Sequence, residues 1–345
     1  MDMAAIGIDL GKSTFHLVAL DTAGRVALRR KLTKRKLIDL AATLPPTLIG
    51  MEACGGAHHL GRILRDQGHD ARIIPAQFVK PFVKSQKNDF LDAEAIAEAV
   101  QRPTMRFVPI KTEEQFDMQT LHRVRDRLVG RRTALINQIR AILLERGLTF
   151  AQGRRGMARL LPELLAAGTD EVSTGMRELL TLLWEEWQDL ERRVCTCTAR
   201  IEAAAEEDET CRKLAAVPGI GLLTATALVA AVANGSTFQR ARDLAAWLGL
   251  VPQQRSTGGK TRLLGISKRG NSYLRRLLVV GAQSARLNLN RERHPRLGEW
   301  LTRLEQRAHR NTAVVALANK LARTAWVILR QGRTYDPTFG MPATA

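Results

Sequence analysis

The apolar run Ala4-Ala-Ile-Gly-Ile-Asp-Leu-Gly11 predicts a buried β-strand, with which a sheet begins. A single carboxylate, Asp9, interrupts this run. The β pattern continues over residues 14–20, and after a turn at 21–24 it returns over 25–32. The chain is therefore expected to open with a β-hairpin.

The next part of the chain alternates helical and strand patterns. Elements are expected in the order helix 34–44, strand 47–52, helix 57–67, strand 71–75 and helix 89–100. A hairpin followed by this alternation predicts an α/β layer fold with a mixed sheet over residues 1–110.

Four carboxylates are expected to meet in one crevice of this sheet. Asp9 and Glu52 each end a predicted strand. Asp89 and Asp92, three residues apart, face the same side of one predicted helix. Carboxylates in such a crevice repel one another unless cations neutralise them, and ligands that are all oxygen select Mg²⁺ or Mn²⁺. Two such ions, about 3.5–4 Å apart, are the usual arrangement for phosphoryl displacement.

A simpler interpretation accounts for two of these residues. Asp89 would cap its helix and Asp92 would lie in the first turn, which is common. Asp9 and Glu52 fit that interpretation less well, because a carboxylate inside an apolar strand is costly unless it is bound to something. The histidine pair at residues 58–59 is expected to lie at the surface or in packing, because the candidate ligands are hard oxygens.

Residues 111–205 contain two long helical patterns of mixed charge, over 112–146 and 172–205. Little strand pattern lies between them, so an extended helical hairpin is expected. Such a hairpin would serve as a coiled-coil dimerisation arm, and an ordinary helical bundle is the alternative.

The last region, residues 206–345, is expected to be mostly helical. Residues 214–231 predict a helix, a tight turn at Pro218-Gly-Ile-Gly221 and a second helix. Backbone N–H groups at the start of the second helix can receive a phosphate, which is the helix-hairpin-helix pattern of sequence-nonspecific DNA binders. Gly219 and Gly221 are the candidate nucleic-acid contacts there. The alternative is an ordinary helix end, because Pro-Gly terminates many helices.

Residues 254–276 form a basic stretch without an acidic residue. Its glycines keep the first half out of a regular helix, so a basic loop is expected. Ser256 lies beside two glycines that let another backbone approach closely, and it is a candidate nucleophile. A solvated basic loop is the simpler alternative. The candidate nucleic-acid-binding cations are Arg255, Lys260, Arg262, Lys268, Arg269, Arg275 and Arg276.

The charge of the chain supports a polyanionic partner. The 345 residues carry a net charge of +19, and residues 206–345 hold 22 Lys and Arg against 9 Asp and Glu. A field of this sign attracts nucleic acid, or less often an anionic membrane surface. No apolar run reaches the length of a membrane span, and Asp2 and Asp9 are incompatible with a signal peptide. Four cysteines without a Cys-x-x-Cys pair argue against a zinc site and fit a reducing cytoplasm.

Four motifs together resemble the DEDD transposases of bacterial insertion sequences, a group that includes the Piv-type DNA invertases. They occur in the family's order and span nearly the whole chain. The motifs are Gly7-Ile-Asp9-Leu-Gly-Lys, Met51-Glu52-Ala-Cys-Gly, Lys87-Asn-Asp89-Phe-Leu-Asp92-Ala, and Arg255-Ser-Thr-Gly-Gly-Lys continued by Gly265-Ile-Ser-Lys-Arg-Gly-Asn271.

This resemblance implies a RuvC-like, RNase H-type N-terminal domain, a coiled-coil middle and a C-terminal transposase domain with a catalytic serine. The implied Mg²⁺-binding tetrad is Asp9, Glu52, Asp89 and Asp92. The resemblance also implies a tetramer and a noncoding guide RNA, encoded by the element, that pairs with donor and target DNA. Many relatives carry two serines, or a serine second, where this chain has Ser256-Thr257. Ser256 is the expected nucleophile, with Thr257 as the alternative.

The favoured hypothesis is DNA strand exchange through a covalent bond between Ser256 and DNA. A first rival is a Mg²⁺-dependent nuclease that resolves branched DNA junctions, which needs the carboxylates and not Ser256. A second rival is a non-catalytic nucleic-acid-binding protein, which needs neither Mg²⁺ nor Asp9.

Overall fold

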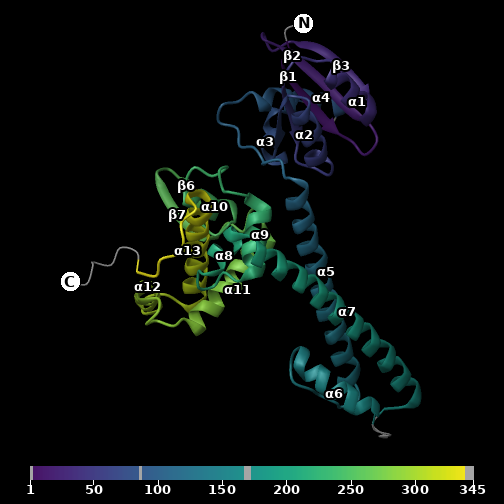
Figure 1. Cartoon of the computed structure of the whole chain (residues 1–345), viewed down its shortest axis with the longest axis vertical. Coiled ribbons are helices and arrows are strands. Elements are labelled where there is room, and N and C mark those ends of the chain that lie inside the picture. The colour runs from purple at the N-terminus through teal and green to yellow at the C-terminus, as the bar shows by residue number, and fades with distance from the viewer. Residues whose placement is uncertain (1–2, 85–87, 167–171, 339–345) are drawn as a thin grey trace, which may run out of the picture. The chain divides into compact units, whose positions relative to one another are not determined.

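The computed structural model describes residues 3–84, 88–166 and 172–338 (Figure 1). Lys87, which opens the third motif, lies outside these residues. The chain divides into two compact units, Met1–Glu113 and Glu114–Ala345. The finer division of the second unit into 111–205 and 206–345 stays a prediction.

A five-stranded sheet forms the centre of the first unit, with the strands in the order β3-β2-β1-β4-β5. Neighbours β1, β2 and β3 run antiparallel, whereas β1, β4 and β5 run parallel. The predicted mixed sheet is therefore confirmed. The strands are β1 (Met3–Leu10), β2 (Phe15–Asp21), β3 (Val26–Leu32), β4 (Leu48–Glu52) and β5 (Asp70–Ile74).

Helices cover both faces of this sheet because side chains alternate along each strand. Ile6 and Ile8 of β1 lie in one buried cluster with residues of α1 and α2. Ala5 faces the other way, into a cluster with α4. The alanine-rich sequence of α4 favours a helix and leaves it thin enough to approach the sheet closely. The helical elements of this unit are α1 (Lys34–Ala42), α2 (Ala57–Asp66), α3 (Ala76–Val79), the 3₁₀ turn η1 (Lys80–Phe82) and α4 (Asp89–Val100).

Gly7 allows α4 to lie directly on β1. A Cβ at this position would come within 2.0 Å of the carbonyl oxygen of Ala93 and 2.4 Å of the amide nitrogen of Ala97. Both obstacles are backbone atoms of α4, so the helix would have to move. This contact sets the depth at which the start of α4 meets the sheet.

Gly7→Ala is therefore expected to destabilise the first unit by about 3 kcal/mol. Hydrogen exchange of peptides from residues 3–113 measures the effect in the unit concerned. Gly55→Ala is the matched control, because a Cβ there meets nothing within 4 Å. Equal protection of the two variants would show that α4 does not rest on Gly7.

Two long helices of the second unit, α5 (Glu113–Leu144) and α7 (Thr174–Glu207), lie side by side (Figure 1). They run antiparallel, because Arg125 bonds Thr198 whereas Arg132 bonds Glu191. The expected helical hairpin is thus present, with α6 (Arg154–Ala166) packed against it. Buried residues recur on α7 at the seven-residue spacing typical of coiled coils, at Leu180, Trp187, Val194 and Ile201. Dimerisation through this hairpin stays a prediction.

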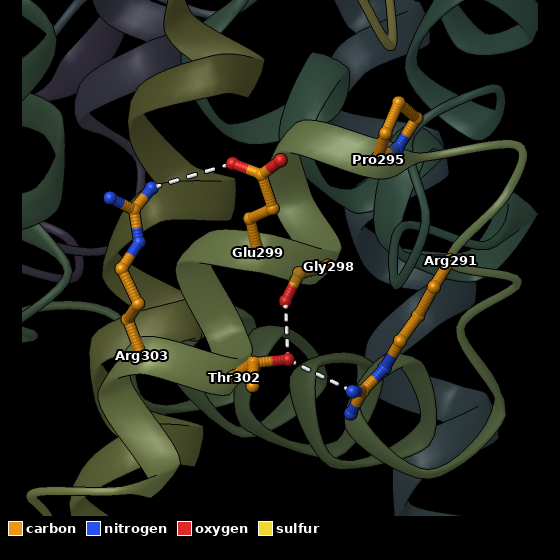
Figure 2. Close-up of a pocket in the computed structure, with 6 residues that line it drawn as sticks. All are labelled: Arg291, Pro295, Gly298, Glu299, Thr302 and Arg303. Atoms are coloured by element: carbon orange, nitrogen blue, oxygen red, sulfur yellow. Dashed lines mark hydrogen bonds and ion pairs between the residues drawn. The ribbon is translucent and has the colours of Figure 1, made fainter.

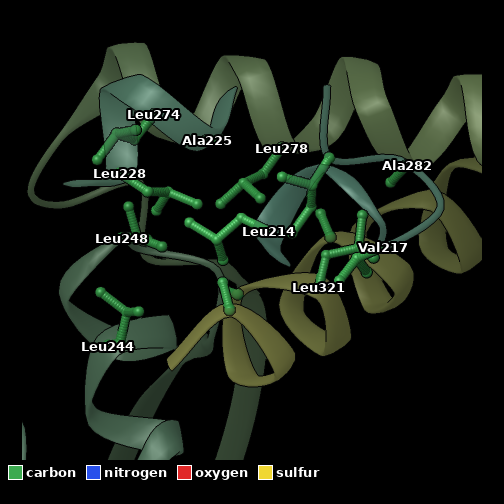
Figure 3. Close-up of a cluster of buried hydrophobic side chains, with 14 of the residues drawn as sticks. Leu214, Val217, Ala225, Leu228, Leu244, Leu248, Leu274, Leu278, Ala282 and Leu321 are labelled. Carbon is green, nitrogen blue, oxygen red and sulfur yellow. The ribbon is translucent and has the colours of Figure 1, made fainter. Parts of the chain in front are cut away.

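The rest of the second unit is mostly helical, as expected, around one apolar core (Figure 3). Leu214, Leu278 and Leu321 bring three different helices together there. Among the described residues α13 alone is long and apolar enough to span a membrane, and 56% of its apolar window is buried inside the protein. The elements are α8 (Glu209–Ala215), α9 (Leu222–Val232), α10 (Ala241–Trp247), β6 (Pro252–Thr257), β7 (Lys260–Ile266), α11 (Ser272–Asn288), α12 (Pro295–Glu305) and α13 (Arg310–Gln331).

The basic stretch is not the loop that its glycines suggested. It folds as an antiparallel hairpin of β6 and β7 with a two-residue turn at Gly258-Gly259. Both glycines have positive φ angles, 56° and 75°, which is the requirement of a type I′ turn. The glycines therefore end a strand here and do not produce an irregular segment. Helices α6 and α12 were also not predicted.

A buried histidine joins α5 to the core of the second unit. His122 Nδ1 lies 2.9 Å from the Tyr273 hydroxyl, and Nε2 lies 3.0 Å from Thr226 Oγ1. The Thr226 hydroxyl donates to the Leu222 carbonyl, so Nε2 is the donor and Nδ1 the acceptor of a neutral imidazole. Burial, and then the charge of Arg125, lower the pKa of His122 to about 4.

This shift predicts a loss of stability in acid. Between pH 6.5 and 4 the unfolded chain binds a proton at residue 122 and the folded chain does not, so the free energy of unfolding falls as the pH falls. The expected loss from this group is about 2 kcal/mol between pH 7 and pH 5. Urea titrations followed by tryptophan fluorescence measure it, because all five tryptophans lie in the second unit. His122→Gln should remove that pH dependence, and an unchanged slope would contradict the assignment.

Candidate active site

Asp9 and Glu52 lie at the carboxyl ends of two adjacent parallel strands. Ile8 of β1 pairs with Met51 of β4, so the residues that follow them come to the same edge of the sheet. By strand alternation both carboxylates face α4: Gly7, two residues before Asp9, contacts α4, and so does Gly50, two residues before Glu52. The structure thus places these two carboxylates at one edge of the sheet, and their role as metal ligands stays a prediction.

The start of α4 brings Asp89 and Asp92 to the same place. One oxygen of Asp89 and one of Asp9 lie within 4.8 Å of each other. Asp92 is close enough to Glu52 for its charge to act on that carboxyl. The helix is capped by Asn88, whose side chain accepts a hydrogen bond from the amide of Phe90. The interpretation of Asp89 as the cap is therefore wrong, and its carboxylate is available for another role.

The electrostatics of this cluster favour a cation. Burial, followed by the charges of Asp9 and Asp92, raises the pKa of Glu52. A carboxyl whose pKa is raised in this way lies near other negative charges, without enough positive charge to compensate them. The donor atoms are carboxylate oxygens on a half-buried edge, which fits the hard divalent ions that carboxylates select. A bound cation would reverse the shift of Glu52.

His16, which no sequence motif indicated, lies beside these carboxylates. His16 lies on β2 directly opposite Asp9 of β1, and it is only 8% exposed. Its Nδ1 is 3.5 Å from an oxygen of Asp89. The sequence signal that could have indicated His16 is a polar residue within an otherwise apolar strand. His58 behaves as expected for a packing residue, since its Nδ1 accepts a hydrogen bond from the amide of Lys111.

Ser256 lies in β6, one residue before the last residue of that strand, and it is exposed. The side-chain Nε2 of Gln254 donates a hydrogen bond of 2.9 Å to Ser256 Oγ. Thr261 Oγ1, on the other strand of the hairpin, lies 3.3 Å from the same Ser256 Oγ. These three side chains share one face of the hairpin because residues alternate along β6 and Ser256 pairs with Thr261. Neither Gln254 nor Thr261 was singled out from the sequence.

The opposite face of the hairpin is basic. Arg255 pairs with Arg262 and Thr257 pairs with Lys260, so these four side chains lie together on the side away from Ser256. Two arginines directly opposite each other repel, and all four residues are exposed. A two-stranded ribbon with such a face is suited to the phosphates of a nucleic acid. Because side chains alternate along β6, the hydroxyls of Ser256 and Thr257 lie on opposite faces of the hairpin. Their adjacent positions in the sequence did not distinguish them.

The other cations of the basic stretch lie at the base of this hairpin. Arg275 Nη1 donates to the carbonyl oxygens of Leu248 and Arg269, at 2.9 and 2.7 Å. Arg276 forms an ion pair with Asp126 and lies over the ring of Tyr273. These described contacts brace the fold. Lys268 and Arg269 are exposed in the turn between β7 and α11.

Gly219 and Gly221 differ in their surroundings. Gly219 packs against α11: a Cβ at Gly281 would lie 1.9 Å from the Gly219 carbonyl oxygen. This close approach gives Gly219 a packing role. Gly221 is exposed, with nothing within 4 Å of a Cβ placed there. The helix, turn and helix are present as α8, residues 216–221 and α9, and DNA binding by the turn stays a prediction.

A surface pocket beside α12 contains none of the predicted site residues (Figure 2). Its charged groups already have partners. Arg303 pairs with Glu299, and Arg291 donates to Thr302, whose hydroxyl donates to the Gly298 carbonyl. We assign no ligand to it.

Comparison with known proteins identifies related chains over almost the whole length. A family model described as "Transposase IS116/IS110/IS902 family" matches residues 211–297, which include Ser256. A DEDD-type IS110 model, described as "Transposase", matches residues 6–147, which include all four carboxylates. A DEDD transposase domain implies the use of a divalent metal ion, typically Mg²⁺.

Individual relatives agree with these models. A "Probable family 20 transposase" of Pseudomonas aeruginosa is 44% identical, over 98% of this chain and 100% of the relative. The "Transposase for insertion sequence element IS1328" of Yersinia enterocolitica is 43% identical, over 97% and 99% of the two chains. A "Pilin gene-inverting protein" of Moraxella bovis is 30% identical over 39% of this chain and 42% of its own. The chain therefore belongs to the IS116/IS110/IS902 family of insertion-sequence transposases, enzymes that bind, cleave and transfer DNA strands.

Proposed function

We propose that this transposase cuts and rejoins DNA through a covalent bond to Ser256, assisted by the carboxylates of the first unit. The observation that carries the proposal is the convergence of Asp9, Glu52, Asp89 and Asp92 in a cluster that favours a cation. Ser256 adds an exposed hydroxyl on a ribbon whose other face is basic.

The proposed step is a displacement at a DNA phosphodiester. The bond between Ser256 Oγ and phosphorus forms as the bond between phosphorus and the 3′ oxygen breaks. The serine proton passes to solvent, and the 3′ oxygen takes up a proton to leave a 3′ hydroxyl. Phosphoserine keeps a phosphodiester linkage, so attack by another 3′ hydroxyl rejoins DNA without an external energy source. An isolated serine hydroxyl is a weak nucleophile and needs activation.

Asp9, Glu52, Asp89 and Asp92 would hold the Mg²⁺ or Mn²⁺ ions. When bound, such ions polarise the phosphate and stabilise charge on the leaving oxygen. The role of the chain is to present four carboxylates on a rigid sheet edge and helix start. At Ser256, Gln254 fixes the rotamer of the hydroxyl by donating to its oxygen, which leaves the hydroxyl proton directed elsewhere.

The basic face of the hairpin is proposed to hold nucleic-acid phosphates. Arg262→Gln is expected to weaken DNA binding to all sequences alike and to lower the slope of log affinity against log salt by about 0.9. Equilibrium binding at several salt concentrations measures both effects. Arg159→Gln, which removes an exposed cation of α6, should leave the slope unchanged. Equal slopes for all three proteins would contradict a phosphate contact at Arg262.

The proposed partners are donor and target DNA, an element-encoded guide RNA and further copies of the chain, as a dimer or tetramer. Arg255, Lys260, Arg262, Lys268 and Arg269 are the proposed contacts to nucleic-acid backbone, with Gly221 at the helix-hairpin-helix turn. Leu179 and Leu182, which are 54% and 62% exposed on α7, support an interface between copies. No membrane partner is proposed, and the proposed location is the cytoplasm.

One observation favours the junction-resolving nuclease as the second candidate. All four carboxylates belong to the first unit, so hydrolysis would need no group from the second. The two candidates differ in the fate of the cut end. Incubation with Mg²⁺ and DNA that flanks the element should yield a 3′ hydroxyl and a protein-linked 5′ end, and no cut without the metal. Cleavage restricted to branched DNA, with both ends free of protein, would favour the nuclease.

A further inference from the structure

His16 lies beside the carboxylate cluster, but it belongs to none of the sequence motifs that predicted the four carboxylates. It faces α4, because Val18 of the same strand packs against residues of α4 and side chains alternate along β2. One nitrogen of His16, one oxygen of Asp9 and one oxygen of Asp89 all lie within 4.8 Å of one another. The side chain is 10% exposed, whereas that of Asp89 is 55% exposed.

Two residues of α4 lie beside the imidazole of His16. The ring of Phe90 meets it edge to face, with the ring centroids 4.8 Å apart. Phe90 follows Asp89 in α4, so the same helical turn supplies the aromatic contact and the neighbouring carboxylate. Nδ1 points towards Asp89, at 3.5 Å from its nearer oxygen. That separation is longer than a good hydrogen bond between these atoms, and the two groups are more suited to sharing a ligand.

We infer that His16 Nδ1 is a nitrogen ligand of the ion held between Asp9 and Asp89, and that it shifts this position towards Mn²⁺ relative to Mg²⁺. The inference rests on the proposed metal-binding function of the cluster. Mg²⁺ takes oxygen ligands and dehydrates reluctantly, whereas first-row transition metals accept imidazole nitrogen alongside carboxylates. One ion site with mixed ligands beside a site with oxygen ligands alone makes the two positions chemically different.

Pulsed electron paramagnetic resonance of bound Mn²⁺ tests this directly, because an imidazole ligand gives a characteristic ¹⁴N coupling. The full-length protein is loaded with less than one equivalent of Mn²⁺ at pH 8. The wild type should show the histidine coupling, and labelling with ¹⁵N-histidine should change it without any substitution. His16→Gln should lose the coupling and bind Mn²⁺ about ten-fold more weakly, with Mg²⁺ affinity changed less. His59→Gln, on the exposed side of α2, is the matched control and should retain the signal.

Two results would overturn the inference while leaving the carboxylate site in place. The first is Mn²⁺ that binds in an Asp9-dependent manner without any histidine coupling. The second is a coupling that persists in His16→Gln. A third result, no Mn²⁺ binding that depends on Asp9, would instead remove the proposed metal function on which the inference rests.

Discussion

Ser256→Ala is expected to abolish the covalent protein–DNA complex and to slow strand exchange by more than about 10⁴-fold, because it removes the proposed nucleophile itself. DNA binding should be retained, since the hydroxyl is exposed and its removal leaves the basic face of the hairpin unchanged. A denaturing gel of labelled substrate measures the complex, and a mobility assay measures binding.

Thr257→Ala is the comparison that the hairpin provides. Thr257 lies on the face opposite Ser256, paired with Lys260. Its loss should lower strand exchange by less than about ten-fold, through a weakened phosphate contact. A covalent complex that still forms in Ser256→Ala and is absent in Thr257→Ala would identify Thr257 as the nucleophile.

Asp9→Asn is expected to lower DNA cleavage by at least about 10³-fold, because the proposed divalent ion would lose one of its carboxylate ligands. The same change should raise the thermal stability of the metal-free protein, since it removes one of the charges that raise the pKa of Glu52. Opposite effects on activity and stability distinguish a site residue from a residue that only supports the fold.

Asp39→Asn supplies the control in the same unit. Asp39 is an exposed carboxylate of α1 that faces Arg35 at 4.0 Å. Its replacement should change neither cleavage nor the metal dependence of the melting temperature. Cleavage by Asp9→Asn at the rate of the Asp39 variant would show that Asp9 has no part in the reaction. DNA binding by all three proteins without any cleavage would argue for the non-catalytic binding protein.

The position of the carboxylates in the first unit could be predicted because strand order determines it. Asp9 and Glu52 end strands that the alternation of helices and strands makes parallel neighbours, and Asp89 and Asp92 begin the next long helix. His16 was missed for a related reason. Its position opposite Asp9 depends on the register of the β1–β2 pair, which a search for motifs does not consider.

The basic hairpin of the second unit could be predicted in composition but not in secondary structure. Gly258-Gly259 is a strong signal for a hairpin turn, but the polar and charged residues beside it give no apolar alternation that would indicate strands. The partners of Arg276 could not be predicted, since Asp126 lies 150 residues away in the chain and only the tertiary fold joins them. The packing of Gly219 against Gly281 likewise depends on how α8, α9 and α11 meet.

We propose that the Asp9 cluster and Ser256 act on one phosphodiester. Mass spectrometry of peptides from the protein–DNA complex, formed with Mg²⁺ on a substrate whose cut end cannot be rejoined, tests it most directly. A nucleotide attached to Ser256 is expected in the wild type, and none is expected in Asp9→Asn. Cut DNA without any attached peptide, or an adduct at Ser256 that forms equally well in Asp9→Asn, would contradict it.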